Sequence, residues 1–154
     1  HMGLQFTLEH GYMQVRGQPQ GAAIHLRIPS VSATENVMLA AVLGHGETTI
    51  DNAACEPEIA DLAGLLSAMG AQITGAGTPH IRIQGVPQLH GAQWATMPDR
   101  IEAGTYIIAS VLAAGPAGVR VKGVPVGALT AFLAKLQEMG AILSIDGPDT
   151  LWVR

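Results

Sequence analysis

Residues 97–105 read Met-Pro-Asp-Arg-Ile-Glu-Ala-Gly-Thr, and this stretch separates two blocks of similar sequence. It brings Asp99, Arg100 and Glu102 close together in a chain of which only 13% is charged. Pro98 disfavours helical geometry at the residue before it, so we expect a helix to begin just afterwards. Carboxylates at a helix start are stabilised by the positive end of the helix dipole. The pattern predicts a helix cap with an ion pair, and a functional role stays open at this point.

The composition indicates a compact domain, or two small ones, with an aliphatic core. Of the 154 residues, 48% are hydrophobic but only 4% are aromatic. The net charge is −4 and no basic stripe occurs, which argues against nucleic acid or an anionic membrane as the main partner. No apolar run has the length of a membrane span, and nothing resembles a signal peptide. The single cysteine, Cys55, excludes an intrachain disulfide and suits a reducing compartment.

Two repeats of about 70 residues account for most of the chain. Leu66–Ala71 matches Leu136–Ala141, and Ala-Val-Leu at 41–43 matches Ser-Val-Leu at 110–112. Hydrophobic periodicity predicts the same plan for each repeat: strand, helix, strand, helix, and two further strands. We therefore divide the chain into a hairpin of a preceding unit at 3–21, a first complete unit at 22–91 and a second at 92–154. Residues 1–2 resemble a cloning scar.

The predicted elements are as follows. A hairpin covers 4–16. The first unit has strands at 24–28 and 48–52, helices at 30–43 and 56–69, and a hairpin around 75–79. The second has strands at 92–97 and 119–121, helices at 100–112 and 126–139, and a last hairpin over 143–153. Ser32 and Glu35 have the spacing of a capping box.

The first helix of each unit is apolar almost all round, so we expect it to be buried on most sides. A lone unit cannot cover such a helix. Neighbouring units must do so, which predicts helices facing inward and sheets facing outward.

Three strings of residues, read in order with the repeat plan, carry a family resemblance. They are 29–36 (Pro-Ser-Val-Ser-Ala-Thr-Glu-Asn), 52–59 (Asn-Ala-Ala-Cys-Glu-Pro-Glu-Ile) and 98–105 (Pro-Asp-Arg-Ile-Glu-Ala-Gly-Thr). From about Leu4 to the C-terminus, the chain resembles the enolpyruvyl transferases. The resemblance implies an α/β (α+β) fold of repeated βαβαββ units. In this family, two domains of three units each form an "inside-out" α/β barrel with helices buried and sheets outside.

The resemblance also implies an activity. Family members of the type that these strings suggest transfer the enolpyruvyl group of phosphoenolpyruvate to the 3-hydroxyl of UDP-N-acetylglucosamine. This is the first committed step of peptidoglycan synthesis, and it is cytoplasmic. The full enzymes are far longer than this chain, which looks like their middle. The string at 98–105 would then be the crossing between the two domains.

Two groups of candidate site residues follow from the resemblance. The family's loop at the first helix start contacts the uridine diphosphate through backbone groups, and its counterparts here are Ile28, Pro29, Ser30, Val31 and Ser32. Relatives usually have Gly in place of Ser32, and a plain helix cap is the alternative reading of this loop. A second group matches positions near the interdomain cleft, where we expect ion pairs and caps rather than chemistry: Glu56, Glu58, Asp99, Arg100 and Glu102.

We expect no catalytic residue in this chain. The family's loop cysteine, its Lys-Asn pair, its anion-binding arginines and its proposed aspartate base have no counterpart here, and Cys55 matches no family cysteine. The six histidines lack metal-ligand spacing, and the glycines form no phosphate-binding or dinucleotide fingerprint, so no metal or cofactor is predicted.

The chain alone should therefore be inactive. An alternative is an isolated or engineered folding unit without catalytic function, which self-associates through uncovered helix faces. A further alternative is an enzyme of the enolpyruvylshikimate-phosphate synthase type, against which the Pro-Asp-Arg-Ile-Glu string argues.

Overall fold

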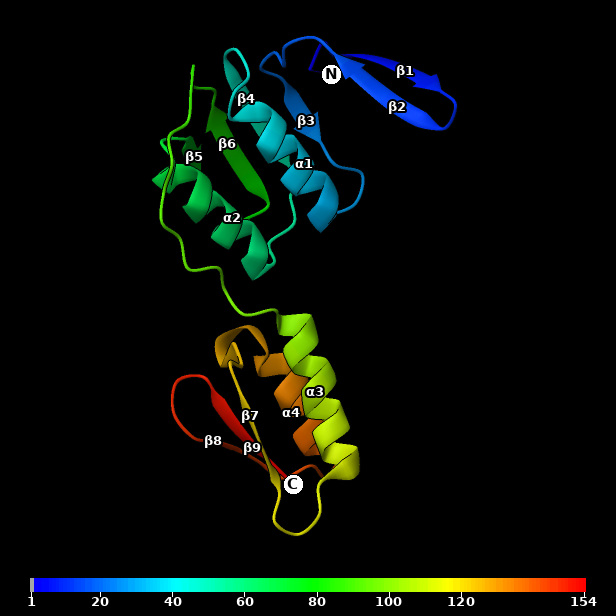
Figure 1. Ribbon diagram of the computed structural model, residues 1–154, viewed down its shortest axis with the longest axis vertical. Coiled ribbons are helices and arrows are strands. Elements are labelled where there is room, and N and C mark those ends of the chain that lie inside the picture. The colour runs from blue at the N-terminus through cyan, green and yellow to red at the C-terminus, as the bar shows by residue number, and fades with distance from the viewer. Residues whose placement is uncertain (1) are drawn as a thin grey trace. The chain divides into compact units, whose positions relative to one another are not determined.

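The computed structural model describes residues 2–154 and shows two compact units, one up to Ala95 and the other from Thr96 to Arg154 (Figure 1). Each unit has its own hydrophobic core. Within the described residues, no helix combines the length and the apolar character that crossing a membrane requires.

The chain opens with an antiparallel hairpin, as predicted. Strand β1 (Gln5–Glu9) pairs with β2 (Tyr12–Arg16), and Gly11 has a φ of 82° in the turn between them. Phe6 lies opposite Val15 and Leu8 lies opposite Met13, which gives the hairpin one apolar face. All ten residues of the two strands are exposed, so this hairpin contributes nothing to either core.

The first unit is built on a four-stranded sheet with the order β3-β4-β6-β5. Strand β3 runs parallel to β4, with Ile24 opposite Ile50, and the other neighbours are antiparallel. Buried and exposed residues alternate along β4 and β6, because successive side chains of a strand point to opposite faces. The strands are β3 (Ala23–His25), β4 (Glu47–Asp51), β5 (Gln72–Thr74) and β6 (His80–Gln84).

Helices α1 (Val31–Ala41) and α2 (Pro57–Ala68) cover one face of this sheet and leave the other exposed (Figure 1). Within the first unit, α1 is buried on one face. Its buried residues, Thr34, Met38 and Ala41, face its own sheet, whereas Leu39 is 51% exposed. The capping-box prediction is wrong, because the helix begins at Val31 and Ser32 lies inside it.

The second unit repeats this plan with one strand fewer. Its sheet has the order β7-β9-β8, and its core contains Ile107, Leu133, Leu151 and Val153. The outer face of its first helix carries the exposed apolar residues Ile101, Tyr106, Ile108 and Leu112. The elements are α3 (Arg100–Ala113), β7 (Val119–Lys122), a 3-10 turn (Val126–Ala128), α4 (Thr130–Glu138), β8 (Leu143–Ile145) and β9 (Thr150–Val153).

The predicted strand at 92–97 is absent, which corrects that part of the sequence interpretation. Trp94 instead lies on α2, where its indole Nε1 donates a hydrogen bond to Asp61 Oδ1 at 3.3 Å. Gly64 of α2 leaves room for the ring, because a Cβ at that position would lie 2.4 Å from Trp94 Cη2. This segment therefore packs on the first unit and forms no ladder with any strand.

Candidate functional site

The sequence strings at 29–36 and 52–59 meet at one end of the sheet in the first unit. Each string follows one of the two parallel strands, β3 or β4. The Leu26 N–H donates to Asp51 O at 3.0 Å, and Asn52 Nδ2 donates to Leu26 O at 2.9 Å. The carboxyl ends of parallel strands in α/β sheets are a recurrent place for ligand binding. We therefore take this end of the sheet as the candidate site.

Thr34 joins the two strings from inside the protein. It is fully buried, its hydroxyl donates to Ser30 O at 2.8 Å, and the same oxygen accepts the Ala54 N–H at 3.0 Å. One side chain thus binds a carbonyl of the first string and provides the acceptor for the buried Ala54 N–H of the second. The loop before α1 and the loop before α2 are fixed to each other by this contact.

The start of α1 suits an anionic ligand. Ser30 is the N-cap, and its Oγ accepts the Ala33 N–H at 3.3 Å. The N–H groups of the first helical turn, which include those of Val31 and Ser32, have no acceptor within the helix. They lie at the positive end of the helix dipole, and no acidic residue occupies this first turn. Exposed Ser32 adds a hydroxyl at the same end of the helix.

The start of α2 is different in character. Glu56 is its N-cap residue and makes no side-chain cap hydrogen bond, Pro57 occupies the first turn, and Glu58 follows. These two carboxylates compensate the helix dipole themselves, so they disfavour a second anion there. Cys55 next to them is exposed, and its Sγ lies 3.7 Å from Ala53 O. A phosphate would consequently be favoured at α1 and not at α2.

The charged string of the second unit forms a helix cap. Asp99 is the N-cap of α3, and its Oδ1 accepts the N–H groups of Ile101 at 2.7 Å and Glu102 at 3.3 Å. Arg100 and Glu102 lie in the first turn of the same helix. A carboxylate thus already fills the anion position of α3. The structural interpretation of this string, a cap at a helix start, is confirmed.

The structure thus places Ile28 to Ser32, Glu56 and Glu58 in the first unit, and Asp99, Arg100 and Glu102 in the second. Sequence reasoning missed the linking roles of Thr34 and Asn52. A polar residue on the buried face of α1 was a signal for Thr34. Asn52 stands out only in the structure, where its φ of 58° is uncommon for residues other than Gly.

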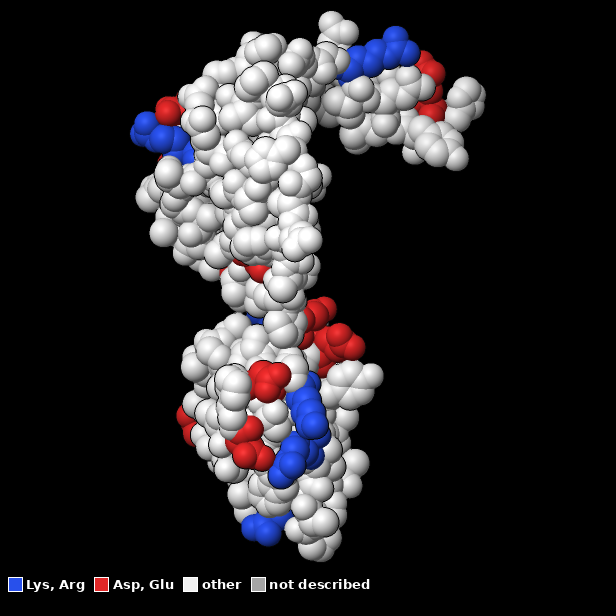
Figure 2. Space-filling view, turned by 60° about the vertical axis from the view of Figure 1, so that its left-hand side comes forward, with Lys and Arg blue, Asp and Glu red and all other residues white. Residues whose placement is uncertain are grey.

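Charge is sparse on the molecule. On the face that Figure 2 shows, uncharged residues dominate, and the charged side chains occur in small groups that contain both signs. Across residues 2–154, no three His, Cys, Asp or Glu side chains are grouped so that they could hold a metal ion.

Comparison with known proteins finds 1-carboxyvinyltransferases both by family model and by sequence similarity. The family model for EPSP synthase (3-phosphoshikimate 1-carboxyvinyltransferase) matches residues 1–153. A UDP-N-acetylglucosamine 1-carboxyvinyltransferase from Acidobacterium capsulatum is 50% identical over 99% of this chain and 35% of its own length. One from Gloeobacter violaceus is 46% identical over 99% of this chain and 33% of its own. The chain thus spans about a third of the curated relatives it matches.

Solved structures with the same fold are also found. The enolpyruvyl transferase NikO from Streptomyces tendae aligns with a TM-score of 0.86 at 27% identity, over 99% of this chain and 39% of that one. An EPSP synthase from Acinetobacter baumannii aligns with a TM-score of 0.64 at 22% identity, over 99% and 36% of the two chains. These likenesses agree with the α/β architecture of repeated units described above.

Proposed function

Since the chain belongs to the EPSP synthase family of 1-carboxyvinyltransferases, we propose that it is part of an enzyme that transfers the enolpyruvyl group of phosphoenolpyruvate to the 3-hydroxyl of UDP-N-acetylglucosamine. The names of relatives that are about half identical to it support this choice of acceptor. The proposal includes the setting of that reaction, the first committed step of peptidoglycan synthesis, in the cytoplasm.

Within this proposal, the loop from Ile28 to Ser32 binds the diphosphate of the sugar nucleotide. The observation that carries the assignment is the start of α1, where a neutral cap, free N–H groups and the helix dipole coincide. The starts of α2 and α3 carry carboxylates in their caps or first turns, so they would repel the same ligand. Thr34 acts as a positioning residue, because it fixes the loop to the string that begins at Asn52.

The remaining candidate residues receive structural roles in the proposal. Asp99 caps α3, whereas Glu56 and Glu58 begin α2.

Transfer forms a bond between the sugar 3-oxygen and C2 of phosphoenolpyruvate, and inorganic phosphate leaves. Stabilisation of the anionic groups in such a step normally supplies a large part of catalysis. Because the first turn of α1, residues 31–34, offers backbone donors but contains no basic residue, we propose that the 154-residue chain binds the nucleotide without turning it over.

A titration tests the binding part of this proposal. The ¹⁵N-labelled chain would be titrated with UDP-N-acetylglucosamine while amide chemical shifts are recorded. We expect shifts at Val31 and Ser32 with a dissociation constant on the order of 1 mM, since part of a site binds weakly. Shifts elsewhere, or none up to about ten times that concentration, would refute the assignment. A chain with Ser67→Ala, an exposed change near the far end of α2, serves as the control and should show the same shifts at Val31 and Ser32.

The same experiment separates the two members of the family. Shikimate 3-phosphate also carries a phosphate but lacks the uridine and the second phosphate. If it shifts Val31 and Ser32 more strongly than UDP-N-acetylglucosamine does, the enolpyruvylshikimate-phosphate synthase type is favoured. A phosphate-release assay with both substrates of the proposed reaction tests the absence of turnover, and we expect no phosphate release from the isolated chain.

We also propose that the isolated chain self-associates. The outer face of α3 exposes Ile101, Ile108 and Leu112, and α1 exposes Leu39. A second copy could cover these apolar side chains, and burial of apolar surface is favourable by about 25 cal/mol per Å². Light scattering at two concentrations tests this, and a monomer at both would contradict it.

A further inference from the structure

Asn52 has an unusual backbone conformation just after β4. Its φ is 58°, in the left-handed region that residues other than Gly seldom adopt. Among residues 2–154, the one other non-glycine residue with a positive φ is His10. His10 lies in the two-residue turn of the β1–β2 hairpin, where positive φ values are usual. Asn52 leads from β4 toward α2 and belongs to no hairpin, so its conformation has a different cause.

The second unit has the same turn with glycine in place of asparagine. Each of β4 and β7 is followed directly by a residue with a positive φ, Asn52 at 58° and Gly123 at 72°. In both units the next N–H donates to the carbonyl just before the antiparallel partner strand, at 3.0 Å from Ala53 and at 2.8 Å from Val124. The turn itself therefore requires only a left-handed residue, which glycine provides most easily. The side chain of Asn52 is what distinguishes the first unit.

That side chain holds the end of β3. Asn52 Nδ2 donates to Leu26 O at 2.9 Å, and the Leu26 N–H donates to Asp51 O at 3.0 Å. Leu26 directly follows β3, and it is thus bound through both its carbonyl and its N–H. Asn52 is half-buried, so its amide is partly shielded from the water that would compete for this contact.

The contact at Leu26 fixes one end of the candidate phosphate loop, and Thr34 fixes the other. The Thr34 hydroxyl donates to Ser30 O at 2.8 Å. Only residues 27–29 lie between these two ends, and the ring of Pro29 restricts its own φ. A short loop held at both ends has few conformations, so the N–H groups at the start of α1 are oriented in the absence of a ligand.

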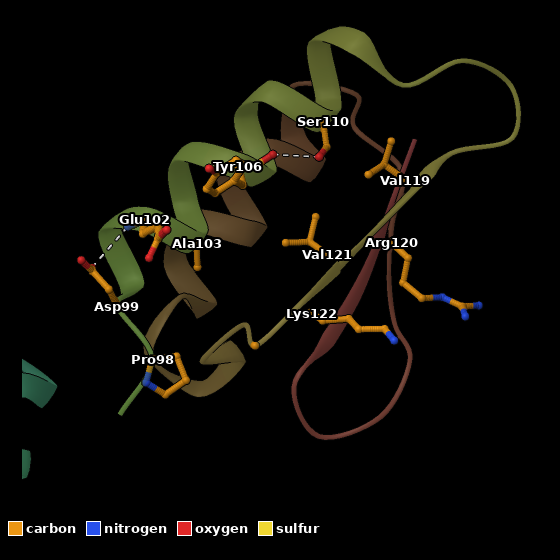
Figure 3. A pocket seen from close by; sticks show the side chains of 11 residues that line it. Pro98, Asp99, Glu102, Ala103, Tyr106, Ser110, Val119, Arg120, Val121 and Lys122 are labelled. Carbon is orange, nitrogen blue, oxygen red and sulfur yellow. Dashed lines mark hydrogen bonds between the residues drawn. The ribbon is translucent and has the colours of Figure 1, made fainter. Parts of the chain in front are cut away.

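The second unit has a different arrangement at the corresponding place. Asp99 and Gly123 both line the pocket between α3 and β7. There the Asp99 carboxylate accepts the Glu102 N–H at 3.3 Å, so an acidic side chain occupies the helix start (Figure 3). The amide donor thus occurs in the unit whose helix start has a neutral cap, and glycine occurs in the unit whose cap is a carboxylate.

We propose that Asn52 is a positioning residue for the nucleotide. It does not touch the ligand, but its amide holds the end of β3 so that the N–H groups of Val31 and Ser32 are oriented for the diphosphate. This inference rests on the nucleotide binding proposed above. A loop that is ordered in advance loses less conformational entropy when the ligand binds, so the contact from Asn52 to Leu26 raises the affinity.

The substitution Asn52→Gly tests the proposal, because it removes the amide, and Gly123 shows that glycine suits this turn. ¹⁵N relaxation of the ligand-free chain measures the order of the loop. We expect the order parameters of the Ile28 and Val31 amides to fall from about 0.85 toward about 0.6. A titration with UDP-N-acetylglucosamine should show binding at least about threefold weaker, as for the loss of one hydrogen bond. Asn52→Asp should lose at least as much, because an ionised carboxylate has no hydrogen to donate.

Ile81→Val is the control for a general loss of stability. This side chain is 1% exposed in the sheet core of the same unit, so removing a methylene from it should lower the stability. We expect this variant to keep the loop order of the unsubstituted chain and its affinity within about twofold. A role of Asn52 in global stability alone would make the Asn52→Gly and Ile81→Val chains behave alike.

Three results would overturn the proposal. Unchanged loop order in both Asn52 variants would show that the amide does not hold the loop. Equal losses of affinity in Asn52→Gly and Ile81→Val would identify a general destabilisation. A loosened loop with unchanged affinity would show that its orientation does not determine binding. Absence of binding in the unsubstituted chain would refute the proposed function instead, and the loop order measured without ligand then still decides whether Asn52 holds the loop.

Discussion

The buried hydroxyl of Thr34 in α1 lies 3.0 Å from the Ala54 nitrogen in the loop after β4 and accepts its hydrogen. The same hydroxyl donates to Ser30 O at 2.8 Å. A helix residue therefore connects the start of its own helix to the loop that follows β4. This connection holds the candidate phosphate loop against the loop after β4.

Replacing Thr34 with Val should destabilise the first unit by about 1–3 kcal/mol, because the buried Ala54 N–H would lose its acceptor while the shape of the side chain is kept. Thr34→Ser keeps the hydroxyl and should cost less. Denaturant unfolding of both variants measures the difference. A loss from Thr34→Val that is smaller than the loss from Thr34→Ser would show that the methyl group, rather than the two hydrogen bonds, determines the stability.

Asp99→Ala should weaken the start of α3 by about 0.5–2 kcal/mol, the usual cost of losing an N-cap acceptor. Asp99→Asn keeps an oxygen that can accept the N–H groups of Ile101 and Glu102. It should lose mainly the interaction of the carboxylate charge with the helix dipole, which contributes about 0.3–1 kcal/mol to stability. Hydrogen exchange measured residue by residue would show faster opening of α3 with the first unit unchanged. Faster exchange in both units would contradict a local cap.

The sequence predicted most elements because their signals are local. The caps at Ser30 and Asp99, the turn at Gly11 and the apolar periodicity of α2 all depend on residues within a few positions of one another. The fate of 92–97 could not be predicted in this way. Its alternation suits a strand, but Trp94 finds a partner in Asp61 and space at Gly64, about 30 residues earlier in the chain.

The candidate site, too, could be predicted only where its signals are local in the sequence. The diphosphate loop was identified from its resemblance to a family and from the physics of a helix start. Two contacts hold this loop. The one from Thr34 to Ala54 joins residues that are 20 positions apart in the sequence, and the one from Asn52 to Leu26 joins residues that are 26 positions apart. Such contacts follow from the parallel pairing of β3 and β4, which no local pattern specifies.

Gly64→Ala should displace Trp94 from α2, because a Cβ there would lie 2.4 Å from the indole ring. In the chain with Trp94 intact, the substitution should therefore destabilise. In a Trp94→Ala background the clash is gone, and the same substitution should stabilise α2 by up to about 1 kcal/mol, since Ala forms helix better than Gly. Unfolding free energies of the four chains form a double-mutant cycle. The same sign in both backgrounds would contradict the contact between Gly64 and Trp94.

Gly85→Ala should be among the most damaging small substitutions in the first unit. A Cβ at this position would lie 1.8 Å from Gly44 O and 3.3 Å from Ala41 O, and both of these are backbone atoms that cannot rotate away. The backbone around Gly85 also carries two hydrogen bonds, from Gly85 N to Gly46 O and from Val86 N to Val42 O. Overpacking of this kind typically costs 1–3 kcal/mol, and we expect at least ~2 kcal/mol here.

Gly91→Ala provides the matched control for Gly85→Ala, because nothing lies within 4 Å of the added Cβ and the residue has no positive φ. It should change the unfolding free energy by less than about 0.5 kcal/mol. Hydrogen exchange at β6 would locate the damage from Gly85→Ala, since Gly85 directly follows that strand. If the two alanine variants unfold at the same denaturant concentration, the end of β6 and the end of α1 are not packed as tightly as described, and the loop after β6 can move away from Gly44 at little cost.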